Sequence, residues 1–129
     1  MPKQFNVSFK SVVIGTGVAL AANVLLFLLG SAAGATWEVG QPAPIGLAAV
    51  AVATLLPMLL GGVVARAIAK RKPNLVGPLT WVALVFSLVG APGGYVASQN
   101  LPTGLALGAM HVVVGFIWFY SVRGKAVAN

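Results

Sequence analysis

Residues 45–65 read IGLAAVAVATLLPMLLGGVVA, an uncharged run that ends at Arg66 and is followed by Lys70, Arg71 and Lys72. A helix needs about 20 mostly apolar residues to cross the hydrocarbon core of a bilayer. The sequence therefore predicts an all-α integral membrane protein, an up-down bundle of four transmembrane helices in a single domain. The four predicted helices cover about residues 11–31, 45–68, 79–98 and 103–122.

The composition of the whole chain agrees with this architecture. Of its 129 residues, 59% are hydrophobic and 7% are charged, whereas a soluble domain carries about 25% charged residues. So few charges could not cover the surface of a water-soluble globule. Trp37, Trp81, Trp118 and Tyr120 also lie near the ends of the predicted spans, where amphipathic rings prefer the membrane interface.

The basic residues fall on one side of the predicted membrane. Lys3 and Lys10 precede the first span, four basic residues follow the second, and Arg123 and Lys125 follow the fourth. The other two loops contain no Lys or Arg and hold the only acidic residue, Glu38. Cytoplasmic loops are enriched in Lys and Arg, so we expect both termini in the cytoplasm. Charges at span ends do not form a nucleic-acid-binding face, and we expect no such partner.

A cleaved signal peptide is the competing interpretation of the first span. The chain starts with basic residues, and Ala33-Gly34-Ala35 resembles a small-x-small cleavage site. The apolar run, however, is about twice as long as the core of a usual signal peptide. We therefore expect this span to remain as a transmembrane helix.

Each predicted helix carries a stripe of small and polar residues at spacings of three and four. Such residues drive association in membranes, because apolar side chains gain little by leaving lipid for another helix. The stripes are Thr16, Ala19, Asn23 and Gly30; Thr54, Pro57, Gly61 and Ala65; Ser87, Ala91, Gly94 and Ser98; and Gly104, Gly108, His111 and Gly115.

One polar residue of each stripe falls at mid-membrane depth when a helical rise of about 1.5 Å per residue is counted from the span ends. These residues are Asn23, Thr54, Ser87 and His111. We expect them to form a shared polar layer, which is a candidate ligand contact. Because the first and fourth helices of such a bundle are neighbours, we expect Asn23 and His111 to share a hydrogen bond, directly or through water.

His111 is the only histidine of the chain. In one interpretation it is structural, a neutral imidazole that ties helices together. In the other it is functional, as a proton relay, a ligand-binding group or the protonation switch of a sensor. We favour the structural interpretation; a haem held by two histidines would need a partner chain.

Prolines lie inside two of the predicted helices. Pro57 removes a backbone donor, so the second helix is expected to kink there. In the third helix Pro92 is followed by Gly93 and Gly94, which predicts a kink or a break. Broken helices within a membrane face protein or a wet cavity, so this break could line an outward-facing pocket together with Tyr95.

Most residues that enzymes use are missing. The chain has no cysteine, one acidic residue and one histidine, which excludes thiolate metal sites, paired carboxylates and nearly every catalytic triad. We expect no enzyme activity, no metal and no cofactor, while a bound lipid fits such a chain. The carboxylate of small multidrug exporters and the filter motifs of fluoride channels are absent from the spans.

Three segments resemble a known family: residues 44–68, residues 81–92 (WVALVFSLVGAP) and residues 105–111 (LALGAMH). They are similar to small bacterial four-helix membrane proteins catalogued only as a domain of unknown function. The similarity spans about residues 42–123, and Ala91 is inserted where family members more often run Gly-Pro directly. The resemblance implies a four-helix fold and no activity. For the chain itself we expect a place in the bacterial cytoplasmic (inner) membrane.

The predicted function follows from the four membrane spans and the scarcity of catalytic residue types. We expect a non-catalytic integral membrane protein that acts through helix–helix contacts, as an accessory or assembly subunit of a larger membrane complex. Its partners would be membrane lipids and other membrane subunits or further copies of itself. The alternative is a small homo-oligomeric transporter or channel with the polar layer around His111 along its path.

Overall fold

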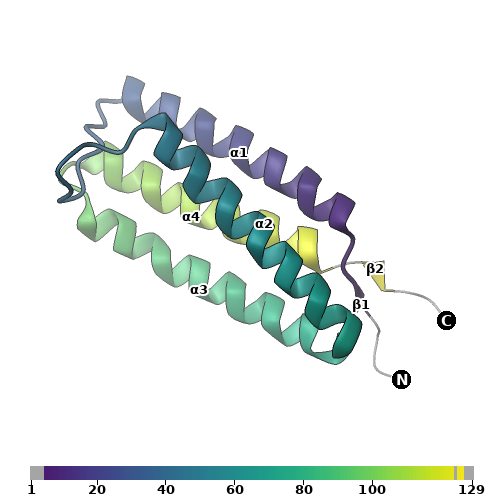
Figure 1. Cartoon of the computed structure of the whole chain (residues 1–129). Helices are drawn as coiled ribbons and strands as arrows, with labels where there is room; N and C mark the ends of the chain where they lie inside the picture. The colour runs from purple at the N-terminus through teal and green to yellow at the C-terminus, as the bar shows by residue number, and fades with distance from the viewer. Residues whose placement is uncertain (1–4, 124, 127–129) are drawn as a thin grey trace.

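The computed structural model of the chain describes residues 5–123 and 125–126. Within them, four α-helices run back and forth: α1 (Phe9–Ala32), α2 (Leu47–Arg71), α3 (Val76–Ala97) and α4 (Leu101–Val122) (Figure 1). Each helix is long and apolar enough to cross a membrane. The prediction of an all-α chain with four membrane-length helices is confirmed.

The helix ends follow local sequence signals. The Asn100 side chain accepts a hydrogen bond from the Thr103 amide and caps the start of α4, as short polar side chains do at helix N-termini. α3 begins three residues earlier than predicted, because the short 3-10 helix η1 (Pro73–Leu75) runs directly into it. Pro78 then lies in the first turn of α3, where its missing N–H costs no intrahelical hydrogen bond.

The two internal prolines do not interrupt their helices. α2 continues through Pro57, and α3 remains helical through Pro92, Gly93 and Gly94 as far as Ala97. Of the two alternatives at Pro92, a kink or a break, the break is therefore wrong. A proline removes a single donor, and the turns on either side keep theirs. Gly94 also lies against Leu107 of α4, so α3 stays in contact with α4 beyond the proline.

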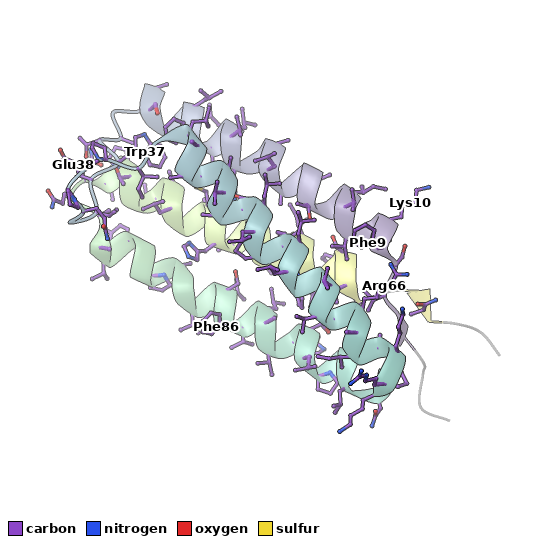
Figure 2. All side chains as sticks on the ribbon, viewed as in Figure 1. Phe9, Lys10, Trp37, Glu38, Arg66 and Phe86 are labelled. Atoms are coloured by element: carbon purple, nitrogen blue, oxygen red, sulfur yellow. The ribbon has the colours of Figure 1, made fainter. Side chains whose placement is uncertain are left out.

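Two short strands, one before α1 and one after α4, pair at one end of the bundle (Figure 1). β1 (Phe5–Asn6) and β2 (Lys125–Ala126) pair antiparallel, and the sequence analysis did not predict them. Lys10 and Arg66 lie at the same end of the bundle as these strands, and Glu38 lies at the opposite end (Figures 1 and 2). We call these the basic end and the Glu38 end; Lys3 lies outside the described residues.

Neighbours in the bundle are not always neighbours in the sequence. α1 packs against α4, α2 packs against α1, and α3 packs against α4, whereas α2 and α3 barely touch. Large apolar side chains cover the outside of the bundle; Phe86 of α3 is 81% exposed. Apolar surface of this extent is unusual for a protein in water and suits helices that face lipid.

Small residues mark the places where helices approach closely. A Cβ on Gly115 of α4 would lie 2.8 Å from the Ser87 Oγ of α3, and a Cβ on Gly62 of α2 would meet the Val12 side chain of α1. The stripe predicted for α2 needs correction, since Pro57 is exposed and Met58 is buried. Small residues are abundant in this helix, so their spacing alone fits more than one face.

The loop that connects α1 to α2 closes the Glu38 end. Trp37 is 5% exposed, stacks on Phe27 and adopts a positive φ of 61°. Its backbone N–H donates to the Thr103 Oγ1 of α4 at 3.0 Å, and its indole N–H donates to the Ser31 Oγ of α1 at 2.9 Å. Trp37 therefore joins the ends of α1 and α4 from inside the bundle.

Candidate functional site

The four predicted polar residues form two separate pairs. The Asn23 Nδ2 of α1 donates to the Thr54 Oγ1 of α2 at 2.8 Å. The Ser87 Oγ of α3 donates to the backbone carbonyl of His111 in α4 at 2.7 Å. Each pair joins residues predicted to share a depth, but the pairs belong to different helix interfaces.

The predicted hydrogen bond between Asn23 and His111 is wrong. α1 and α4 are neighbours as expected, but α4 turns Ser121 toward Gly15 of α1. His111 points instead toward α3, where glycines leave room for its ring. A Cβ on Gly90 would lie 3.1 Å from the His111 Cδ2, and a Cβ on Gly94 would lie 3.8 Å from its Cε1. The rotation of α4 about its axis therefore separates the imidazole from the carboxamide.

The Asn23 pair lies in a buried interface. Both Asn23 and Thr54 are 3% exposed, and the Thr54 hydroxyl donates onward to the Val50 carbonyl at 2.8 Å. The Asn23 Oδ1 is buried and accepts no hydrogen bond from the described residues. This pair has the position and partners of a tie between α1 and α2.

The His111 imidazole is exposed on the surface of the bundle and bonds only within its own helix among the described residues. Its Nδ1 lies 2.9 Å from the Leu107 carbonyl. A carbonyl oxygen only accepts, so Nδ1 is the donor of this bond, and in a neutral ring Nε2 is then an acceptor. No described residue donates to Nε2. The side chain thus presents a free acceptor halfway along α4.

This geometry changes the interpretation of His111. The tie between α3 and α4 uses the backbone carbonyl of His111 and the Ser87 hydroxyl, so any side chain at position 111 could supply it. The contact of α4 with α2 uses another residue. Two turns after His111, Trp118 lies against Gly61 of α2, and its Nε1 is 3.0 Å from where a Cβ on that glycine would be. The imidazole is therefore free to contact a molecule outside the chain.

The sequence predicted that Tyr95 and the region around Pro92 line one outward-facing pocket, but the structure places them differently. The Tyr95 ring lies against Gly104 of α4, and its Cδ2 is 2.8 Å from where a Cβ on that glycine would be. Pro92 and Gly93 are exposed, and no atom of the described residues lies within 4 Å of where a Cβ on Gly93 would be. Sequence reasoning also missed the contribution of Thr103, whose bond to Trp37 has no spacing signal because the two residues are 66 positions apart.

The chain was compared with known protein families, curated proteins and solved structures. A family model described as "Family of unknown function (DUF6069)" matches residues 5–128. No curated protein and no solved structure matches the chain.

Proposed function

The chain belongs to this family of unknown function (DUF6069), and we propose that it is a non-catalytic accessory or assembly subunit that binds other membrane proteins through helix–helix contacts. We further propose that it spans the bacterial inner membrane four times, with both termini in the cytoplasm. The basic end carries Lys10 and Arg66 and the opposite end carries Glu38 (Figure 2), which supports this orientation because Lys and Arg are enriched on the cytoplasmic side.

The observation that carries the proposal is the free Nε2 of His111. In hydrocarbon a polar group without a hydrogen-bond partner is costly, and polar side chains in membrane helices commonly bond across helix interfaces. A partner helix that supplies an N–H or O–H donor would satisfy Nε2 and cover the open Gly93 of α3 at close range.

The proposal includes no catalysis, metal or cofactor. One histidine, one acidic residue and no cysteine offer no nucleophile–base pair and no ligand set in this chain. Membrane lipids remain expected partners, since large apolar side chains such as Phe86 and Val96 lie on the outside of the bundle.

The same exposed imidazole favours one second candidate, a homo-oligomeric transporter or channel. Copies that face one another through α3 and α4 would bring several His111 rings together along a path. Asn23 and Thr54 would not line that path, because their side chains are buried between α1 and α2.

One experiment separates these functions. The tagged chain is extracted from native membranes in a gentle detergent, and co-purifying proteins are quantified by mass spectrometry for the wild type, His111→Ala and the control Val112→Ala. A subunit should retain a stoichiometric partner that His111→Ala loses and Val112→Ala keeps. Retention of the partner by both variants contradicts the proposal. Solute flux in proteoliposomes of the purified wild type, lost on His111→Ala, would support the transporter instead.

A further inference from the structure

A groove lies at the basic end of the bundle, away from His111. It has a volume of about 770 Å³ and is formed by the last turns of α2, the first residue of α1 and the end of η1. Its lining includes Phe9, Val63, Arg66, Lys70, Arg71 and Leu75. None of these residues takes part in the polar pairs described above.

One part of the groove is strongly basic. Arg66, Lys70, Arg71 and Lys72 all line it. The only acidic side chain in the sequence, Glu38, lies at the opposite end of the bundle (Figure 2). No Asp or Glu of this chain can therefore neutralise these cations, and the groove suits a ligand that brings negative charge.

The other part of the groove is apolar. Val63 and Val64 line it about two turns of helix before Lys70 and Arg71, a separation of about 10 Å along the axis. Phe9 is 45% exposed and Leu75 is 40% exposed. The groove therefore passes from charged to apolar along the direction in which the proposed membrane passes from headgroups to acyl chains.

Arg66 is held at the junction of the two parts. Its guanidinium carbon lies 5.8 Å from the centroid of the Phe9 ring, a distance typical of a cation–π contact. This contact joins α1 to α2 and restrains a side chain that can bind phosphate with two parallel hydrogen bonds. Figure 2 shows Phe9 and Arg66 side by side at this end.

We infer that this groove binds one anionic phospholipid, with its phosphate between Arg66 and the Lys70–Lys72 cluster and an acyl chain along Val63 and Val64. Basic pockets on the cytoplasmic side of membrane proteins bind anionic headgroups. A free phosphate would use the cations and leave the apolar part uncovered. The inference rests on the proposed membrane orientation and is independent of any partner protein at His111.

The test measures lipid binding to the purified full chain in detergent by native mass spectrometry. Phosphatidylglycerol, phosphatidylcholine and inorganic phosphate are the three probes. Arg66→Gln should weaken phosphatidylglycerol binding about tenfold, the loss expected for one charge-assisted contact. Lys10→Gln is the matched control, because Lys10 is a basic residue at the same end that does not line the groove.

Arg66→Lys and circular dichroism separate binding from folding. The Lys variant keeps the charge and loses the bidentate geometry, so we expect phosphatidylglycerol binding between that of the wild type and of Arg66→Gln, with unchanged helicity. Equal binding of phosphatidylglycerol and phosphatidylcholine would overturn the inference. So would equal losses in Lys10→Gln and Arg66→Gln, which indicate diffuse surface charge, or competition by inorganic phosphate as strong as that of the lipid.

Discussion

The carboxamide of Asn23 and the hydroxyl of Thr54 meet at 2.8 Å between α1 and α2, where both side chains are almost fully buried. The bond continues to the Val50 carbonyl, so α2 accepts a donor from α1 without giving up its own side-chain bond. A polar contact therefore holds α1 and α2 together in addition to their close packing.

Thr54→Val should destabilise the bundle more than Asn23→Ala. The first change leaves the Asn23 Nδ2 buried without an acceptor, which costs about 1–3 kcal/mol. The second removes the donor together with the unpartnered Oδ1 and should cost about 1 kcal/mol. A double-mutant cycle of unfolding free energies in detergent measures the coupling, which we expect at about 0.6–2 kcal/mol. Strictly additive effects would show that the bond contributes nothing.

Gly115→Ala should destabilise the packing of α3 on α4 by about 1–3 kcal/mol, the usual cost of overpacking. The new methyl group would meet the Ser87 Oγ and Cβ at 2.8 and 2.9 Å. Gly17→Ala in α1 is the control, since a Cβ there meets nothing within 4 Å, and it should be neutral or stabilising. Thermal unfolding measures both. Ser87→Gly should restore part of the stability of Gly115→Ala, and failure to do so would place the strain elsewhere.

His111→Ala should change the unfolding free energy of the isolated chain by less than about 0.5 kcal/mol. The ring is exposed and bonds only to the Leu107 carbonyl of its own helix, while the Ser87 bond uses the backbone. Chemical unfolding in detergent gives the value. A loss of several kcal/mol would instead make the imidazole a structural tie of the bundle and remove the argument for an external partner.

Trp37→Ala should lower the free energy of unfolding by about 3–5 kcal/mol, the usual cost of truncating a buried aromatic side chain. We expect the effect to be concentrated at the Glu38 end. Trp37→Phe should cost about 1–2 kcal/mol, because it can still stack on Phe27 but loses the 2.9 Å bond to Ser31. Hydrogen exchange of the amides in the loop after α1 reports where the loosening occurs. Equal costs for the two substitutions would mean that stacking contributes little.

The spans and the depths of their polar residues were predictable from the sequence, because run length and rise per residue depend only on position along the helix. The residues that pair, Asn23 with Thr54 and Ser87 with His111, do lie at matching depths. The orientation of each helix about its own axis, which decides the face that it turns to each neighbour, was not predictable. In α2 and α4 glycine and alanine occupy several faces, so spacing could not show that His111 turns toward α3.

The features outside the spans carried still weaker signals. The strand pair Phe5–Asn6 and Lys125–Ala126 is two residues long on each side, too short for a periodic pattern. Trp37 near a span end predicted an interfacial ring, whereas the structure buries it. Its position depends on a backbone φ of 61° and on Thr103, a partner far along the chain.

The packing of α1 against α4 has a consequence for biosynthesis. During translation the α1–α2 hairpin emerges first and can close around Asn23 and Thr54 at once, whereas the α1 surface around Gly15 waits until Ser121 has left the ribosome. The nascent bundle therefore stays unfinished along its central contact until its last helix is made.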